Sequence, residues 1–189
     1  MHPTPLIGLG RWRNLLLQDP LLPDAAWFVD THWEPVERQR ILTYLRQGRP
    51  LHHWMSHAQC EFRCQLPGSH MPDVELTDSM YLWPEMLIHQ IEQHSVRLPA
   101  QFVAHALDQA AFPTAQAAEA EEGTAVDYTW WHAQPGWQQK VSTLSLLPPE
   151  EVRCYLSRYA RGAIEYGSET AETVARRAQI VQELRQQID

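Results

Sequence analysis

The chain has 189 residues, of which 44% are hydrophobic, so it fits a single domain with a buried core. No apolar run approaches the roughly 20 residues of a membrane-spanning helix, and the first residues lack the order of an export signal, so we expect a cytoplasmic protein without a membrane partner. The net charge is −8, and positions 72–127 hold ten acidic residues against Arg97 alone, which argues against nucleic-acid binding. This acidic segment is either a surface for a basic protein partner or simply a well-hydrated face.

Prolines and tryptophans characterise the first 33 residues. Because prolines block long regular elements, we expect an extended arm that is held by its aromatic side chains, with a short helical turn near residues 15–17. The first clear helix is predicted over residues 35–47. Pro35 suits the first helical position, an apolar face follows, and Gly48 ends the helix.

The next segment combines strand and turn signals. We expect a strand over residues 51–58 and a loop over residues 65–72, which hold two prolines and a glycine. Residues 74–83 are rich in strand formers. This pattern predicts one strand, or two short strands with a turn near Asp78–Ser79.

Helical patterns dominate the remainder. One helix is predicted over Pro84–His94, and Pro99 opens a second. Residues 108–127 are rich in Ala and Glu, and we interpret them as a linker or surface loop between residues 1–107 and residues 128–189, where an aromatic loop precedes two helices. The predicted fold is α+β, with a zinc-finger-like unit of a small β-hairpin and a helix inside a mostly helical single domain.

Four residues have the chemistry and spacing of a zinc site. Cys60 and Cys64 are separated by three residues, and His89 and His94 are separated by four near the end of a predicted helix. Zinc favours four tetrahedral thiolate and imidazole ligands, and such closed sites are structural. We therefore predict one structural zinc ion here. Because the two histidines are about 140° apart on an ideal helix, the last helical turn has to loosen.

Other interpretations of these residues stay open. His57 and His70 flank the cysteines and could replace one helix histidine, or the thiols could simply be buried side chains. A catalytic zinc keeps an open position for water and has a general base nearby. Glu85 and Glu92 share the helix, but neither forms the His-x-Glu or His-Glu-x-x-His pattern of zinc hydrolases and deaminases, so we do not predict an enzyme.

The segment Thr77–Leu98 resembles a family of small uncharacterised bacterial proteins. Their pattern has Thr-Asp-Gly, an aromatic residue before Trp-Pro-Glu, two histidines five apart, and Val-Arg-Leu-Pro, with a Cys-x2-Cys knuckle and an Asp-x-x-Trp segment upstream. The positions that match this pattern are Val29–Trp33, Cys60, Cys64, Trp83–Glu85, His89, His94 and Val96–Pro99. The resemblance covers about residues 24–107 and implies a zinc-finger-like unit. The chain departs from it by a Cys-x3-Cys knuckle and by Ser79 in place of Gly.

Together these patterns favour a non-catalytic, zinc-stabilised, acidic protein-interaction protein, such as an immunity or antitoxin-type inhibitor of a bacterial toxin. The predicted partner-binding residues are Glu119, Glu121, Glu122, Asp127, Trp130 and Trp131. The aromatic side chains among them could instead pack the C-terminal helices onto the rest of the domain. The first alternative function is a hydrolase-like zinc enzyme. The second is a transcription-associated finger protein, which the absence of Arg and Lys from the predicted zinc-site helix argues against.

Overall fold

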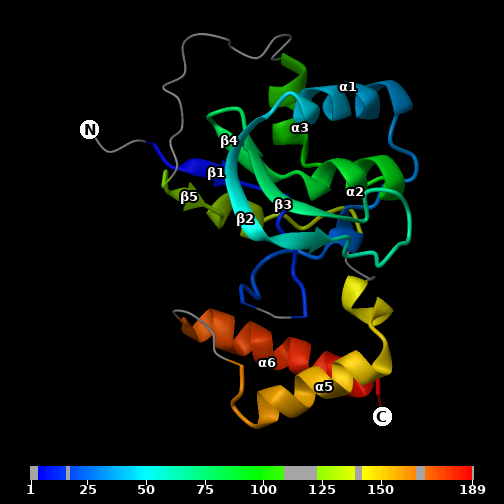
Figure 1. Ribbon diagram of the computed structural model, residues 1–189, viewed down its shortest axis with the longest axis vertical. Helices are drawn as coiled ribbons and strands as arrows, with labels where there is room; N and C mark the ends of the chain where they lie inside the picture. Colours follow the sequence, from blue (N-terminus) through cyan, green and yellow to red (C-terminus); the bar gives the residue numbers. More distant parts are fainter. Residues whose placement is uncertain (1–3, 16–17, 109–122, 139–141, 165–168, 189) are drawn as a thin grey trace.

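A five-stranded sheet with the order β2-β3-β4-β1-β5 is the centre of the computed structural model, which describes residues 4–15, 18–108, 123–138, 142–164 and 169–188 (Figure 1). The strands are β1 (Leu6–Gly8), β2 (Arg49–Gln59), β3 (His70–Thr77), β4 (Tyr81–Pro84) and β5 (Val126–Asp127). The described helices are α1 (Pro35–Arg46), α2 (Met86–His94), α3 (Ala100–Asp108), α4 (Thr129–His132), α5 (Pro149–Ala160) and α6 (Ala171–Gln186), with short 3-10 helices at Ala25–Phe28 and Thr143–Leu146.

The antiparallel part of the sheet follows most of the sequence signals, although β3 begins at His70, inside the predicted loop, and β4 includes Pro84, which was predicted to open the next helix. Strands β2, β3 and β4 are consecutive and antiparallel, and Leu76 pairs with both Pro50 and Trp83. The turn between β3 and β4 is held by Asp78, whose carboxylate accepts the N–H groups of Met80 and Tyr81 at 2.8 and 2.6 Å. Ser79 has a φ of 75°, a value that favours glycine. A glycine would adopt this conformation more readily than the serine present here.

The sheet is larger than the predicted hairpin because two short strands add to it in parallel. β1 pairs with β4 on one side and with β5 on the other. Neither strand was predicted, since segments of three and two residues carry no alternation of polar and apolar side chains. The pairing of β1 and β5 therefore depends on tertiary contact. With its sheet and helices the fold is α+β, as expected, and the zinc-finger-like unit stays a prediction.

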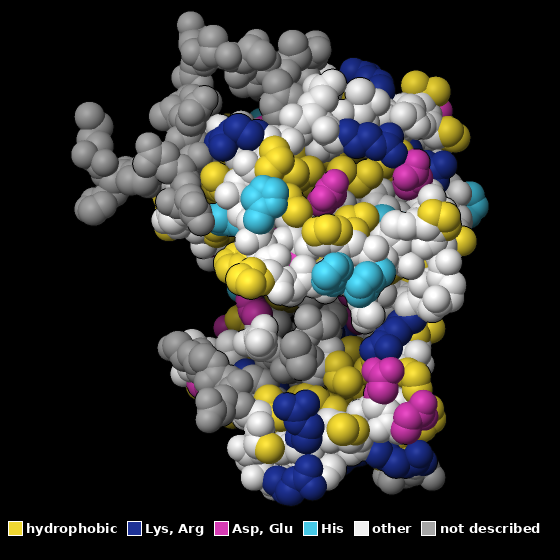
Figure 2. All heavy atoms as spheres, in the orientation of Figure 1, with side chains coloured by type: hydrophobic (Ala, Val, Ile, Leu, Met, Phe, Trp, Pro, Cys, Tyr) yellow, Lys and Arg dark blue, Asp and Glu magenta, His cyan; other side chains and the backbone are white. Residues whose placement is uncertain are grey.

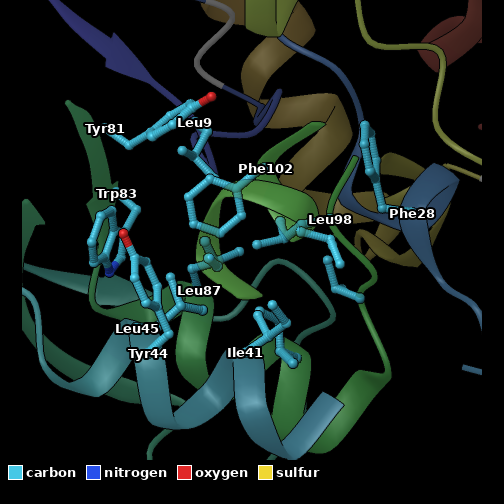
Figure 3. Close-up of a cluster of buried hydrophobic side chains, with 14 of the residues drawn as sticks. Leu9, Phe28, Ile41, Tyr44, Leu45, Tyr81, Trp83, Leu87, Leu98 and Phe102 are labelled. Carbon is cyan, nitrogen blue, oxygen red and sulfur yellow. The ribbon is translucent and has the colours of Figure 1, made fainter. Parts of the chain in front are cut away.

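Helices α1, α2 and α3 pack together and enclose the main core. Ile41 and Leu45 of α1 meet Leu87 of α2 and Phe102 of α3, beside Trp83 of β4 (Figure 3). Each of these side chains is fully buried. Burial of large apolar side chains contributes about 1.5–3 kcal/mol each, so this cluster is the main source of stability. Helix α1 begins as predicted, with Pro35 in its first turn and the Glu34 carboxylate accepting the Glu37 N–H at 2.7 Å.

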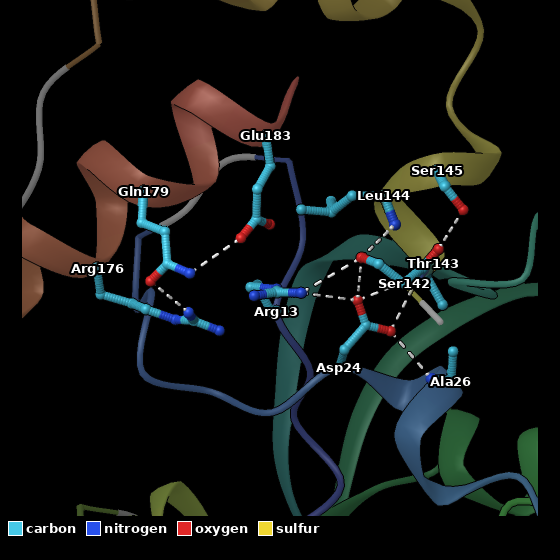
Figure 4. A network of polar contacts seen from close by, with 10 residues as sticks. All are labelled: Arg13, Asp24, Ala26, Ser142, Thr143, Leu144, Ser145, Arg176, Gln179 and Glu183. Carbon is cyan, nitrogen blue, oxygen red and sulfur yellow. Dashed lines mark hydrogen bonds and ion pairs between the residues drawn. The ribbon is translucent and has the colours of Figure 1, made fainter. Parts of the chain in front are cut away.

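The C-terminal helices α5 and α6 lie together at the opposite end of the molecule from α1 (Figure 1). They have their own small apolar cluster, which includes Tyr155, Ile180 and Leu184. A buried polar network links this end to the main body. The Asp24 carboxylate accepts hydrogen bonds from Arg13, Ser142 and the Thr143 N–H (Figure 4).

The edge strand β2 is the most exposed part of the sheet. Trp54 is 52% exposed and Met55 is fully exposed. Figure 2 shows histidine and hydrophobic side chains beside one another on the face formed by β2 and β3. Among the described residues, no helix is long and apolar enough to cross a membrane.

Candidate metal centre

The two cysteines lie in the loop that joins β2 to β3. The pairing of Gln59 with His70 closes the hairpin, and the Cys60 N–H extends it by donating to the Ser69 carbonyl at 2.9 Å. Within the loop, the Arg63 N–H donates to the Cys60 carbonyl at 2.9 Å, and Arg63 has a φ of 52°. This left-handed residue tightens the turn, so the three-residue spacer still brings the sulfur of Cys64 back beside that of Cys60.

The two histidines come from the second half of α2. His89 is buried and His94 is the last residue of the helix. The final turn is wider than an ordinary α-turn, because the N–H of Ser95 bonds to the carbonyl of Gln90, five residues earlier. Ser95 itself is left-handed, with a φ of 54°. The helix end therefore loosens as predicted, and this allows residues five apart to turn toward one point.

The structure brings all four predicted ligands together. One donor atom from each of Cys60, Cys64, His89 and His94 lies within 4.8 Å of every other. The Cys64 Sγ and His89 Nε2 are 3.3 Å apart. Neighbouring ligand atoms around a tetrahedral zinc are about 3.5 Å apart, which follows from bond lengths of about 2.3 Å to sulfur and 2.0–2.1 Å to nitrogen. The four side chains are close enough to bind one metal ion.

The surroundings of His89 orient it as a ligand. Its Nδ1 lies 3.2 Å from the Pro67 carbonyl, which can only accept, so Nδ1 carries the proton and Nε2 presents its lone pair toward Cys64. Metal-binding histidines commonly donate their second nitrogen to a backbone carbonyl in this way. Gly68 follows Pro67 in the left-handed region, with a φ of 80°, a conformation that favours glycine.

His94 gives independent support for a ligand at this point. Its Nε2 is buried and has no hydrogen-bond partner in the structure. Leaving a buried polar atom unpaired costs about 1–3 kcal/mol. The ring is held in place by Phe62, which stacks on it with centroids 4.3 Å apart. A metal ion in the cluster would satisfy the unpaired nitrogen without moving the ring out of this stack.

The protonation states of the cluster match its use as a metal site. Burial lowers the pKa of His89 and of His94, so both imidazoles are neutral at pH 7, the form that binds metal. Burial, together with the neighbouring Cys64 and Glu61, raises the pKa of Cys60 to about 12. The metal-free thiol is therefore protonated, and metal binding has to release this proton.

A polar chain that the sequence analysis missed ties the loop to the helix. The Trp12 indole N–H donates to Gln90 Oε1 at 2.7 Å, and the Gln90 amide donates to the Glu61 carboxylate. Burial raises the pKa of Glu61 to about 7. The three residues are far apart in sequence and show no joint pattern, so only the folded arrangement reveals the link.

The alternative ligands do not join the cluster. His57 and His70 stack on each other with centroids 4.8 Å apart, on the paired ends of β2 and β3. Of the candidate bases of a zinc enzyme, Glu92 pairs with Arg46 at the surface at 3.0 Å. Glu85 precedes α2, and its backbone N–H donates to the Val74 carbonyl of β3 at 2.8 Å.

The predicted partner-binding residues have different environments. Asp127 is exposed and accepts the Thr129 N–H at 2.8 Å, and Trp130 is partly buried with its N–H on Gln101. Trp131 must be withdrawn from the partner surface, because it is fully buried against Trp12 and Phe28 and donates to the Arg11 carbonyl at 2.6 Å. The remaining three predicted residues, Glu119, Glu121 and Glu122, lie outside the described part of the chain.

No protein-family model, no curated protein sequence and no solved structure matches this chain. The resemblance inferred from the sequence therefore stays a prediction, and the geometry of the molecule is the basis on which a function can be proposed.

Proposed function

We propose that the chain is a non-catalytic protein-interaction protein in which a structural zinc ion clasps the β2–β3 loop to helix α2. The observation that carries this proposal is the convergence of two thiols and two imidazoles, all within 4.8 Å of one another. Four such donors fill a tetrahedral shell, so water has no coordination position from which to react. The metal then stabilises the fold, and the function resides on the surface that it supports.

Charge supports a basic partner. In the described residues up to position 138 there are thirteen acidic residues and eight arginines, a net charge of −5. The described residues of the C-terminal part, from position 142 onward, have five acidic residues and six arginines. The acidic excess therefore lies on the main body. An acidic surface accelerates the capture of a basic partner, and added salt weakens this effect.

Part of the predicted acidic surface is neutralised internally. Asp73 and Glu75 both pair with Arg11, while Asp78 is held by Tyr44 and His105. The partner surface is consequently narrower than the acidic segment that the sequence suggested. An immunity or antitoxin-type inhibitor of a basic toxin remains the specific form of the proposal, and a zinc enzyme has less support because one candidate base, Glu92, is already paired with Arg46 at the surface.

The proposal can be tested with the zinc-loaded chain immobilised at low salt and exposed to extracts of the cells that produce it. We expect a basic protein to be captured, and the purified pair to bind about tenfold or more weakly when ionic strength rises from 50 to 200 mM. A purified partner that is acidic, or whose affinity does not change with salt, would contradict the proposal. Hydrolytic turnover that depends on the bound metal would contradict its non-catalytic part.

A further inference from the structure

A second site lies beside the sheet, away from the metal cluster. It is a pocket of about 470 Å³, within the usual size range of ligand sites. The N-terminal arm, strands β2 and β3, and the residues around β5 form its walls. The side chains that matter for its chemistry are Arg11, Asp19, His52, Trp54, Glu75 and Tyr128.

Glu75 organises the floor of this pocket. Its side chain is 5% exposed. One carboxylate oxygen accepts Arg11 Nε and Nη2 at 3.0 and 2.8 Å, and the other accepts His52 Nδ1 at 2.9 Å and the Trp54 indole N–H at 3.3 Å. Burial alone would raise the pKa of Glu75, but Arg11 and the hydrogen bonds hold it below its usual value, so the group is charged. Arg11 also pairs with Asp73.

The walls are fixed before any ligand arrives. The Tyr128 ring lies directly on the backbone of Gly8, where a Cβ would come within 2.3 Å of it. On the other side, Trp131 donates to the backbone carbonyl of Arg11 at 2.6 Å. A site built on such buried contacts loses little conformational entropy on binding.

The pocket offers acceptors and aromatic faces. In the tautomer whose Nδ1 donates to the Glu75 carboxylate, the acceptor of the His52 ring is Nε2. Asp19 adds a carboxylate that is 37% exposed. One of its oxygens pairs with His132 Nε2 at 2.8 Å and the other accepts the Leu21 N–H at 3.1 Å, which leaves each oxygen a second acceptor position. The indole of Trp54 is half-exposed, and Tyr128 supplies a second ring. Arg11 is the charged donor of the pocket, but it is already engaged by Glu75 and Asp73.

A planar cation that only donates hydrogen bonds fits these features. A guanidinium stacks on aromatic rings and donates in its plane to carboxylate and imidazole acceptors. We propose that this pocket binds an arginine side chain of the basic protein partner. This inference rests on the proposed function and names the chemistry by which the partner would be recognised.

A peptide titration of the full zinc-loaded chain tests the pocket without the natural partner. The probe is acetyl-Gly-Arg-Gly-amide, followed through the indole N–H resonance of Trp54. Its matched control replaces arginine with citrulline, which keeps the planar group and removes the charge. We expect saturable binding of the arginine peptide, roughly tenfold tighter than that of the citrulline peptide.

Variants show whether the pocket itself is responsible. Trp54→Ala and Asp19→Asn are each expected to weaken binding of the arginine peptide several-fold, as monitored by the remaining pocket resonances. Met55→Ala, at the next position on β2, should leave it unchanged, since Met55 is fully exposed and does not line the pocket. Unaltered thermal unfolding of each variant confirms its fold.

Two kinds of result would overturn the inference. One is equal binding of the citrulline and arginine peptides, or no saturation by tens of millimolar arginine peptide. The other is a purified basic partner whose affinity is unaffected by Trp54→Ala and Asp19→Asn, which would leave the proposed function intact and remove the pocket from it. Conversely, arginine binding in the pocket without any basic partner would support the site and contradict the proposed function.

Discussion

The two ends of the molecule are each stabilised by a different set of interactions. Among the residues that the structure describes, the main body has twenty buried residues in one cluster, many of them aromatic, and it contains the candidate metal centre. The C-terminal helices α5 and α6 share a cluster of six buried residues. Between the two clusters lies a polar junction centred on Asp24, rather than a continuous apolar core.

This difference indicates where each kind of interaction is needed. The loop of residues 60–69 is mostly exposed or partly buried, so apolar burial contributes little to holding it. We therefore expect it to depend on its polar contacts and on the proposed metal. The C-terminal helices instead have an amphipathic pattern that a small apolar seam can satisfy. Removing the metal, breaking the Asp24 junction and truncating the apolar cluster between α5 and α6 should therefore lower stability by successively smaller amounts.

The largest effect is expected from removing the metal. At a free zinc concentration about a thousandfold above its dissociation constant, a bound ion stabilises the fold by about 4 kcal/mol. Chelation, or the Cys60→Ser variant, should lower the free energy of unfolding of the main body by an amount of this order. Metal analysis and thermal unfolding with and without chelator measure both quantities, with one zinc per chain expected for the unmodified protein.

The chain provides matched controls for this experiment. Cys154 is an exposed cysteine on α5, so Cys154→Ser should retain the metal and the stability. His57→Ala should behave in the same way, whereas His94→Ala should lose the metal. Metal retained by Cys60→Ser, or lost equally by His57→Ala, would contradict the ligand set.

Much of this arrangement could be predicted from the sequence, and the remainder depends on tertiary contact. The helices that begin at Pro35 and Pro149 have local start signals, and the four ligands have recognisable types and spacings. The parallel pairing of β1 has no local signal, because three residues become a strand only beside β4. Trp131 was misassigned for a similar reason, since an aromatic loop looks the same in sequence whether it is buried or exposed.

The next largest effect is expected at the junction. Asp24 is fully buried and pairs with Arg13, which is 2% exposed. Asp24→Ala leaves this buried guanidinium without its carboxylate, which typically costs 3–5 kcal/mol. We expect a loss of about 4 kcal/mol in chemical denaturation, with the metal still bound. Asp30→Ala is a useful control because Asp30 forms a partly exposed pair with Arg97, and its loss should be far smaller.

An intermediate effect is expected in the C-terminal seam. Leu184 is fully buried between α5 and α6. Leu184→Ala should lower stability by about 2–4 kcal/mol, because buried leucines cost this much when truncated. Hydrogen exchange should show faster opening of α5 and α6, with the protection of α2 retained. Equal loss of protection in α2 would mean that the two clusters unfold as one unit and would contradict the separation proposed above.

The smallest effect concerns the surface link between the two ends. Arg63, in the metal loop, forms a bidentate pair with Glu151 on α5 at 2.9 and 2.7 Å, and both side chains are about two-fifths exposed. Exposed ion pairs contribute at most about 1 kcal/mol, so Glu151→Ala should cost about 0.5 kcal/mol. Glu150→Ala is the matched control, since it removes a carboxylate from the same helical turn and reports the helix-dipole contribution alone. The difference between the two variants should vanish in 1 M salt, where the screening length falls to about 3 Å. The two variants could still differ in their free energy of unfolding at high salt, or Glu151→Ala could cost more stability than Leu184→Ala. Either result would mean that the Arg63–Glu151 pair, and not the Asp24 junction, joins the two ends.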